Sequence, residues 1–547
     1  MQRADRLPGT ARAANRANRN GNGLSLLVLL IAFVASLPLL VALLSFLGGS
    51  GDVWSHLARY VLPQALVNTL WLAAGVAVGT AILGVSLAWF VAACEFPGRA
   101  FFSWAMLLPM AMPGYVLGFA FAALFEYTGP VQGAWRELFG TSDRFPDIGS
   151  RGAAIATLIL TLYPYVYLIV REAFVSQGVR GLEVARSAGY RPLAGFVRVT
   201  LPMARPWIAA GVSLAVMECL ADFGTVKLFN YTTFTTAIYR AWYGLFSLQS
   251  ALQLSLVLVV LVLIALVLER RFRGRARYTH LGSARQSRRM ILRRDKAWCV
   301  SAVCGTVLFI AFGLPTGLIL VWSFENFALE FDSGYWVLIG NTLMLASFAA
   351  LIITSVAMLL GFTVRRSPGI ANRTLARVAT LGYAIPGTVL AVGFFVPVAW
   401  LSRTLNRTLA GDTTIIALQS GLAVILLAYL ARYLAVAHGP VESALQRIRP
   451  NVEEAARGMG VFGLRLLGRV HLPILRPAIL TAALLVFVDI MKELPITLMT
   501  RPFGWDTLAV RVFQLTTEGE WERAALPAIA IVIAGLLPVI LLSRRRH

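Results

Sequence analysis

Long apolar runs alternate with short polar segments along the whole chain of 547 residues. A run of about 20 apolar residues is long enough to cross a lipid bilayer as an α-helix. Hydrocarbon offers no hydrogen-bond partner to backbone amides, so such runs are expected to be helical. We place twelve of them, near residues 24–47, 66–94, 101–125, 152–170, 207–224, 250–268, 298–322, 341–363, 376–401, 413–437, 475–499 and 524–543. The pattern predicts an all-α polytopic membrane protein.

Short motifs recur in the same order in the two halves of the chain, at offsets of 271 to 273 positions. The matched pairs are Asn68-Thr69-Leu70 with Asn341-Thr342-Leu343, Pro113-Gly114 with Pro386-Gly387, Leu201-Pro202 with Leu472-Pro473, and Arg205-Pro206 with Arg476-Pro477. One match alone is weak evidence, but the ordered series predicts a duplicated six-helix unit. We therefore expect a first repeat at 1–269, a basic linker at 270–297 and a second repeat at 298–547.

A polar loop inside each repeat carries the most distinctive pair of motifs. The first reads Glu183-Val184-Ala185-Arg186-Ser187-Ala188-Gly189, and the second reads Glu454-Ala455-Ala456-Arg457-Gly458-Met459-Gly460. In each we expect a short helix that begins near the Glu and stops at the Gly, with small residues that let another protein approach closely. The alternative is a loop that lies in the lipid headgroups with its Arg side chains reaching water.

Composition supports the membrane assignment and limits the partners. The chain is 58% hydrophobic and only 14% charged, whereas soluble proteins carry about 25% charged residues. Its net charge of +23 comes from basic residues gathered in the N-terminal tail, the linker and the C-terminus. Because basic loops stay on the cytoplasmic side, we expect both termini in the cytoplasm and contact with anionic lipid, and no nucleic acid.

Acidic residues inside the apolar runs are the second group of candidates. Glu218 and Asp222 are four residues apart and so share a helix face, and Asp489 and Glu493 repeat the arrangement. Carboxylates in a membrane usually face a protein interior or water, so these four are candidates to line a translocation path. The structural alternative is that they pair with a cation such as Lys492 or cap broken helix ends.

The loop motif resembles the cytoplasmic coupling motif of ATP-binding-cassette (ABC) importer permeases, with Val184 in place of the usual Ala. The wider sequence, including Asp222-Phe223-Gly224-Thr225-Val226 and Lys492-Glu493-Leu494-Pro495, is similar to fused two-repeat permeases of iron(III) importers. Thiamine importers have a similar fused permease. The resemblance implies a bacterial inner-membrane protein whose coupling residues are Glu183, Ala185, Arg186 and Gly189, and Glu454, Ala455, Ala456, Arg457 and Gly460. It also implies two copies of a cytoplasmic ATPase and a periplasmic substrate-binding protein as partners.

The chain has no Gly-x4-Gly-Lys-Ser/Thr motif to cradle nucleotide phosphates. We therefore expect a transport subunit that is not an enzyme and holds no cofactor, with ATP bound by its partners. Its four Cys and five His are too scattered to predict a stable metal site. An ion-driven secondary transporter is the rival of another class. A channel is disfavoured, because no segment resembles a selectivity filter.

Overall fold

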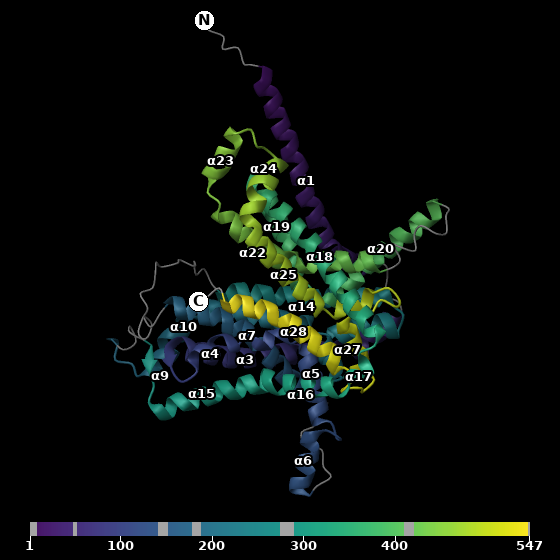
Figure 1. Ribbon diagram of the computed structural model, residues 1–547. Helices are drawn as coiled ribbons and strands as arrows, with labels where there is room; N and C mark the ends of the chain where they lie inside the picture. The colour runs from purple at the N-terminus through teal and green to yellow at the C-terminus, as the bar shows by residue number, and fades with distance from the viewer. Residues whose placement is uncertain are drawn as a thin grey trace. The chain divides into compact units, whose positions relative to one another are not determined.

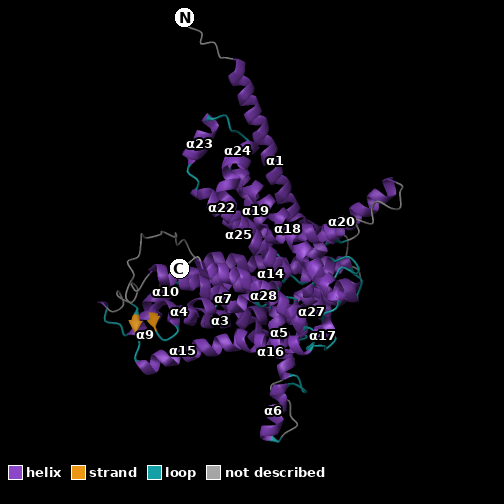
Figure 2. Ribbon diagram, in the orientation of Figure 1, coloured by secondary structure: helices purple, strands orange, loops and turns teal. Residues whose placement is uncertain are grey.

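The computed structural model describes residues 8–47, 52–140, 151–177, 187–273, 289–409 and 421–544. This part of the chain is helical almost throughout (Figure 2). Within the described residues, nine helices are long and apolar enough to span a membrane, and the number reaches eleven if each of two bent helix pairs counts as one span. The last expected run corresponds to a shorter apolar helix at Ala525–Ile540. The all-α polytopic architecture predicted from the sequence is confirmed.

The chain forms two compact units, and each combines segments from both repeats. The first comprises residues 1–47 and 341–505, and the second comprises residues 48–340 and 506–547. The sequence repeats and the packing units are therefore different divisions of the chain. The packing units do not test the predicted repeat boundaries, which stay a prediction.

The first unit is built around the second repeat. Its elements are α1 (Pro8–Leu44), α18 (Ser333–Arg366), α19 (Ile370–Thr380), η6 (Leu381–Ala384), α20 (Gly387–Leu409), α22 (Leu422–Arg447), α23 (Pro450–Gly458), α24 (Leu464–Leu466), η7 (Leu467–His471), α25 (Leu472–Met491) and α26 (Pro495–Thr500). Helix α1 runs alongside α19 (Figure 1) and also packs on α20 and α22. The first span of the chain thus packs against helices of the second repeat.

The second unit holds the rest of the first repeat together with the ends of the second. Its elements before the linker are α2 (Asp52–His56), η1 (Leu57–Val61), α3 (Leu62–Ala93), β1 (Cys94–Glu95), α4 (Arg99–Ala105), η2 (Leu108–Ala111), α5 (Gly114–Phe125), α6 (Pro130–Phe139), α7 (Arg151–Gln177), α9 (Pro192–Gly195), η3 (Phe196–Thr200), α10 (Leu201–Met203), α11 (Arg205–Ala221), α12 (Gly224–Leu228), α13 (Phe234–Tyr239), η4 (Arg240–Gly244) and α14 (Leu248–Arg273). After the linker come β2 (Met290–Ile291), α15 (Arg294–Leu308), η5 (Phe309–Gly313), α16 (Leu314–Glu325), α17 (Phe327–Glu330), α27 (Leu508–Thr517) and α28 (Ala525–Arg544). The two strands pair in parallel, Cys94 with Met290, and join the end of α3 to the end of the linker.

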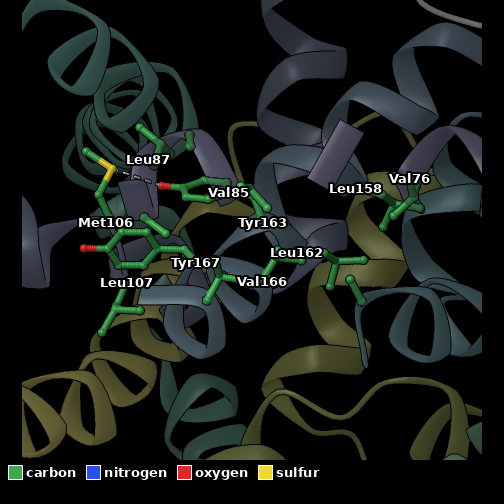
Figure 3. Close-up of a cluster of buried hydrophobic side chains, with 14 of the residues drawn as sticks. Val76, Val85, Leu87, Met106, Leu107, Leu158, Leu162, Tyr163, Val166 and Tyr167 are labelled. Atoms are coloured by element: carbon green, nitrogen blue, oxygen red, sulfur yellow. Dashed lines mark hydrogen bonds between the residues drawn. The ribbon is translucent and has the colours of Figure 1, made fainter. Parts of the chain in front are cut away.

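The core of the second unit lies between α3 and α7. Tyr163 and Tyr167 on α7 are fully buried, and their hydroxyls donate to Met106 Sδ at 3.7 Å and to the Ser103 carbonyl at 2.9 Å (Figure 3). Glycines on the facing side of α3 allow the close approach, since a Cβ at Gly79 would lie 2.1 Å from Ile159. Small residues commonly permit such close helix packing in membranes.

Four Leu-Pro pairs are each preceded by a wider helical turn. Proline lacks an amide hydrogen, and its ring clashes with the carbonyl four residues earlier. A π-helix precedes each of four such pairs, and in each the leucine amide donates to the carbonyl five residues earlier: η1 before Leu62-Pro63, η3 before Leu201-Pro202, η5 before Leu314-Pro315 and η7 before Leu472-Pro473. The wider turn carries the helix up to the proline without an interruption.

The packing of α1 on the second repeat can be tested at Gly393 of α20. A Cβ there would lie 2.5 Å from Cβ and 2.7 Å from Cα of Pro38 in α1. We expect Gly393→Ala to lower the free energy of unfolding by about 1–3 kcal/mol, the usual cost of overpacking, and to lower the melting temperature of the purified protein. Gly317→Ala is the control, because a Cβ at that helical position meets nothing within 4 Å. Equal melting temperatures for the two variants would contradict the contact.

Candidate functional site: coupling loops and buried carboxylates

The second polar loop contains the expected short helix, α23. Pro450 occupies its start, where a missing amide hydrogen costs nothing. At its end, Val461 N donates to Ala456 O at 2.9 Å and Gly460 N donates to Arg457 O at 3.0 Å, which is the Schellman pattern. Gly460 has φ +79°, a left-handed conformation that suits glycine. The helix and its glycine stop are confirmed in this copy.

Helix α23 has one buried face and one exposed face. Of the coupling residues expected here, Ala456 is 3% exposed and packs inward. The others lie on the surface: Glu454, Ala455, Arg457 and Gly460. Met459, beside them, is 77% exposed. The exposed face therefore combines small residues and Met459 with two opposite charges, and its docking role stays a prediction.

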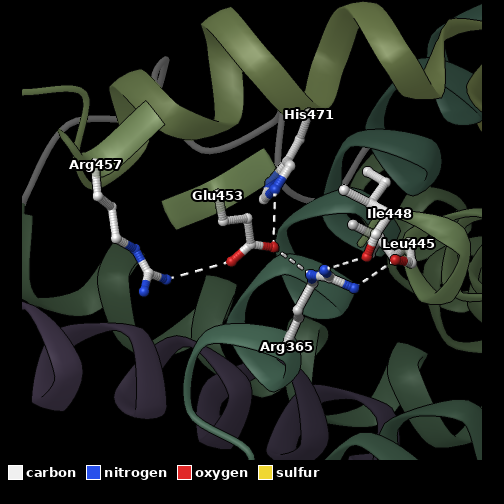
Figure 4. A network of polar contacts seen from close by, with 6 residues as sticks. All are labelled: Arg365, Leu445, Ile448, Glu453, Arg457 and His471. Carbon is white, nitrogen blue, oxygen red and sulfur yellow. Dashed lines mark hydrogen bonds and ion pairs between the residues drawn. The ribbon is translucent and has the colours of Figure 1, made fainter. Parts of the chain in front are cut away.

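The buried face is held by Glu453, a residue that the sequence reasoning did not single out (Figure 4). Its Oε1 accepts a hydrogen bond from Arg365 Nε, at the end of α18, and lies 3.2 Å from His471 Nε2. Its Oε2 lies 3.3 Å from Arg457 Nη2. Arg365 also donates to the carbonyls of Leu445 and Ile448. One carboxylate thus ties α23 to α18 and to η7, the π-helix that leads into α25.

The charge of Glu453 is stabilised by these contacts. Burial tends to raise its pKa, but the hydrogen bond and charge of Arg365, with the nearby His471 and Arg457, outweigh burial and hold the pKa of Glu453 below its ordinary value. A lowered carboxylate pKa contributes stability above the unfolded-state pKa, and that stability is lost as pH falls through the folded pKa. Glu453 is therefore ionised at neutral pH.

The first polar loop lies largely outside the described residues, which exclude Glu183, Ala185 and Arg186. Its final glycine is described: Gly189 is exposed and has φ +78°, almost the value at Gly460. Both loops then lead through a π-helix, η3 or η7, into the following span. The two loops share their ending, and the roles of Glu183, Ala185 and Arg186 stay predictions.

In the second unit, Asp222 sits where α11 ends and α12 begins. Its Oδ1 accepts a hydrogen bond from Val226 N at 3.1 Å, and its Oδ2 accepts one from Thr225 Oγ1 at 2.9 Å. Its carbonyl accepts a third from Thr235 Oγ1 at 2.7 Å. Asp222 therefore provides a hydrogen-bond acceptor for a backbone amide at the start of α12, where the helix itself offers none.

Glu493 does the same in the first unit, between α25 and α26. Its Oε1 accepts from Ile496 N at 2.8 Å, and its Oε2 accepts from Thr497 N at 3.1 Å and from Thr497 Oγ1 at 2.9 Å. The side chain is only 6% exposed. A buried carboxylate with three donors is well satisfied.

Each capping carboxylate also lies against a Pro-Gly break. A Cβ at Gly114 would lie 2.6 Å from Thr225 Oγ1 and 3.3 Å from Asp222 Oδ2. A Cβ at Gly387 would lie 3.1 Å from Glu493 Oε1. These glycines begin α5 and α20, so each carboxylate stands near the starts of two helices, where negative charge is favoured. Two motifs that looked separate in the sequence form one structural element.

The other two acidic residues are half-buried, as Asp222 is. Asp489 pairs with Lys492, with Oδ1 and Nζ 3.0 Å apart, and Glu218 lies one helical turn before Asp222 on α11. The structural alternative expected caps and ion pairs, and the structure contains both: Asp222 and Glu493 cap broken helices, and Asp489 pairs with Lys492. The path-lining role of the four residues stays a prediction.

Among the described residues, no group of three or more His, Cys, Asp or Glu side chains could hold a metal ion. The network around Glu453 is the feature that the sequence reasoning missed. An Arg at the end of one span and a Glu in the first turn of the loop helix were available as signals. Arg365 was one of many basic residues at span ends, where positive charge is expected on topological grounds alone.

Replacing the carboxylate of Glu453 should loosen α23. In Glu453→Gln, Arg365 loses a charged acceptor, and hydrogen bonds to charged groups contribute about 1.5–3 kcal/mol. We expect amide hydrogen exchange in residues 450–461 to accelerate by about tenfold to a hundredfold, measured by mass spectrometry on the purified chain.

The matched control is Glu454→Gln, the same substitution on the next residue. Glu454 is exposed, so its variant should keep the exchange rates of the unsubstituted protein. Similar exchange in the two variants would mean that Glu453 does not hold the helix.

Comparisons with known proteins extend this picture over the whole chain. The family described as "Binding-protein-dependent transport system inner membrane component" matches twice, at residues 82–278 and 353–545. The chain is 27% identical to the Fe(3+)-transport system permease protein FbpB 2 of Haemophilus influenzae, over 95% of this chain and 98% of the relative. It is 20% identical to the ferric transport system permease protein FbpB of Actinobacillus pleuropneumoniae, over 95% of this chain and 76% of the relative.

A shorter relative matches one part of the chain. The sulfate transport system permease protein CysT of Escherichia coli is 28% identical over 37% of this chain and 72% of its own length. The two family matches begin at residues 82 and 353, 271 positions apart, which is the offset of the loop motifs. The duplicated unit is thus confirmed, and the chain belongs to the family of multi-pass inner-membrane components of binding-protein-dependent transport systems.

Proposed function

We propose that this protein is the membrane-spanning subunit of an ABC importer that moves iron(III) across the bacterial inner membrane by alternating access. The cargo assignment is supported by relatives matched along nearly the whole chain, whose names specify ferric or Fe(3+) transport. Permeases for sulfate and molybdenum match shorter parts of it. Thiamine or another small solute is the alternative cargo, because cargo choice in such systems lies mostly in the separate binding protein.

The observation that carries the proposal is the docking helix α23. Its outer face exposes Glu454, Ala455 and Arg457, and its inner face is tied through Glu453 to α18 and η7. A cavity of about 350 Å³, lined by Arg457 and Phe462 among others, opens beside it and offers a side chain of a docked protein a place to enter. A push on this helix would be transmitted to two spans at once.

The energy is proposed to come from outside the chain. The sequence has no phosphate-cradling Gly-x4-Gly-Lys-Ser/Thr loop, so we assign ATP hydrolysis to two copies of a cytoplasmic ATPase, one on each loop. A periplasmic binding protein delivers the cargo. Closure of the ATPase pair would draw the loops at Glu183 and Glu454 together and turn the bundle from inward-open to outward-open.

The orientation follows from the basic segments. The N-terminal tail, the linker and the end of the chain are rich in Arg, whereas residues 323–340 contain Glu325, Glu330 and Asp332 and no Lys or Arg. The positive-inside rule puts the three basic segments, both termini among them, in the cytoplasm. Four predicted spans precede the first loop and ten precede the second, so both loops face the ATPase side.

For the translocation path, Glu218 and Asp489 are the stronger candidates of the four carboxylates. Asp222 and Glu493 are occupied as helix caps, and losing either would leave backbone amides unsatisfied. Glu218 and Asp489 occupy matching positions one turn earlier and remain partly exposed. Carboxylate oxygens suit a hard cation such as iron(III).

Association with the ATPase should depend on the end of α23. We expect Gly460→Asp to abolish co-purification of the ATPase subunit, because it strains a left-handed residue at φ +79° and adds a charge to the docking face. Gly369→Asp is the matched control: Gly369 is exposed, precedes α19 with φ −59°, and Asp is a favoured residue before a helix.

The same experiment separates the rival class. An ion-driven secondary transporter needs no ATPase, so failure of any ATPase subunit to co-purify with the unsubstituted chain, together with uptake that follows an ion gradient, would overturn the proposal. Equal retention of the ATPase by Gly460→Asp and Gly369→Asp would instead remove the coupling role of this loop.

The path assignment predicts a selective loss of transport. Glu218→Gln with Asp489→Asn should lower iron uptake into proteoliposomes at least tenfold while ATPase association is retained, since both residues lie away from the loops. Asp295→Asn, which removes an exposed carboxylate outside the spans and the coupling loops, provides the comparison for uptake per ATP hydrolysed. Uptake at the unsubstituted level in the double variant would exclude these two carboxylates from the path.

A further inference from the structure

A polar cavity lies in the second unit, at the end of α11 away from the coupling loop. Helix α11 starts just after that loop and spans 17 residues, about 25 Å at 1.5 Å per residue. The cavity has a volume of about 310 Å³ and is formed by α12, α13, η4 and the end of η1. Its lining is Val61, Lys227, Asn230, Tyr231, Thr232, Thr236, Ala237, Tyr239, Arg240, Tyr243 and Gly244.

This lining is rich in hydrogen-bond donors and carries two positive charges. Lys227 and Arg240 are the charged members, and none of the lining residues is acidic. Within the described ranges, neither Lys227 nor Arg240 makes an ion pair or a side-chain hydrogen bond. The side-chain amide of Asn230 makes no hydrogen bond to these ranges either. Asn230 and Arg240 are exposed and Lys227 is half-buried, so all three polar groups of the cavity are accessible to a ligand.

At the matching position of the second repeat, the arginine forms an ion pair with a buried glutamate. Arg511 lies 271 positions after Arg240, and its Nη2 is 3.4 Å from Oε2 of the buried Glu330. Lys227 has no counterpart, because Leu498 occupies the matching position. The first repeat thus keeps two uncompensated cations where the second repeat keeps one neutralised arginine.

Hydrogen bonds within the protein hold the walls of the cavity in place. Tyr231 donates its hydroxyl to the Asn68 carbonyl at 3.1 Å, and its amide donates to Val226 O at 2.8 Å. Thr233 and Thr236 form a capping box at the start of α13. The rings of Tyr239 and Tyr243 stack with centroids 5.1 Å apart. The site is therefore preformed.

We propose that this cavity binds a small oxyanion, a group bearing carboxylate or phosphate oxygens. Arg and Lys make their strongest hydrogen bonds to such oxygens, and Asn and Thr side chains add neutral donors. The volume is at the small end of the range for ligand pockets, about 300–1,000 Å³. The anion has two sources in a membrane, a soluble metabolite or a phospholipid headgroup. The proposal does not depend on which cargo the protein carries.

The test compares a double variant with a charge-matched control. Lys227→Gln with Arg240→Gln removes both cations of the cavity, and Arg294→Gln with Lys296→Gln removes an exposed Arg and Lys near the start of α15. The full chain, reconstituted in phosphatidylcholine nanodiscs, is titrated calorimetrically with citrate and with inorganic phosphate. We expect saturable binding by the unsubstituted chain and the control, and affinity at least tenfold lower in the cavity variant.

A second arm identifies a lipid source. Native mass spectrometry of the protein extracted from membranes would show a retained anionic phospholipid, which the cavity variant loses and the control keeps. Either arm supports the site and names its ligand. If neither anion binding nor lipid retention depends on Lys227 and Arg240, the proposal is wrong. The single variant Arg240→Gln, at an exposed position, repeats both arms should the double variant unfold.

Discussion

The contact between a carboxylate and the backbone amides of a broken helix is the interaction on which this structure depends. A membrane offers no water to an exposed amide, so a span that stops inside it must be capped by protein. Asp222 and Glu493 provide that cap after the fifth span of each repeat. Because the starts of α5 and α20 lie against the same carboxylates, a Cβ at Gly114 would clash with Thr225 at 2.6 Å, and a Cβ at Gly387 would make a tight contact with Glu493 at 3.1 Å. One constraint thus explains the buried acids and the Pro-Gly breaks together.

The second constraint acts at the coupling loop, where two consecutive glutamates have opposite roles. Glu453 points inward and holds α23 through Arg365 and His471, whereas Glu454 points outward. The docking role proposed for α23 would need both, because a surface that is bound but not anchored would move without moving the spans. The anchoring carboxylate reaches α18 and η7 together, so displacement of one short helix is shared between two long ones.

The hydrophobic pattern was sufficient to predict the helices, their breaks and the glycine stop at Gly460. It could not predict that α1 packs on the second repeat, because an apolar run has no preference between lipid and any particular neighbour. The packing site of α1 is determined by shape complementarity, because the missing side chain at Gly393 leaves room for Pro38. Nor could it separate Glu453 from Glu454, since both lie in one polar loop and only the position of Arg365 decides which one is buried.

The two repeats keep the residues that satisfy the backbone, whereas some charged side chains occur in one copy only. The Pro-Gly breaks, the capping acids and the Leu-Pro pairs occur in both copies. In contrast, Glu453 and His471 correspond to Leu182 and Thr200, 271 positions earlier, and Lys227 corresponds to Leu498. A backbone amide needs a partner in either copy, so its partner cannot be lost without breaking the span. Side chains on which no backbone amide depends are free to diverge, so Glu453, His471 and Lys227 each occur in the sequence of one repeat only.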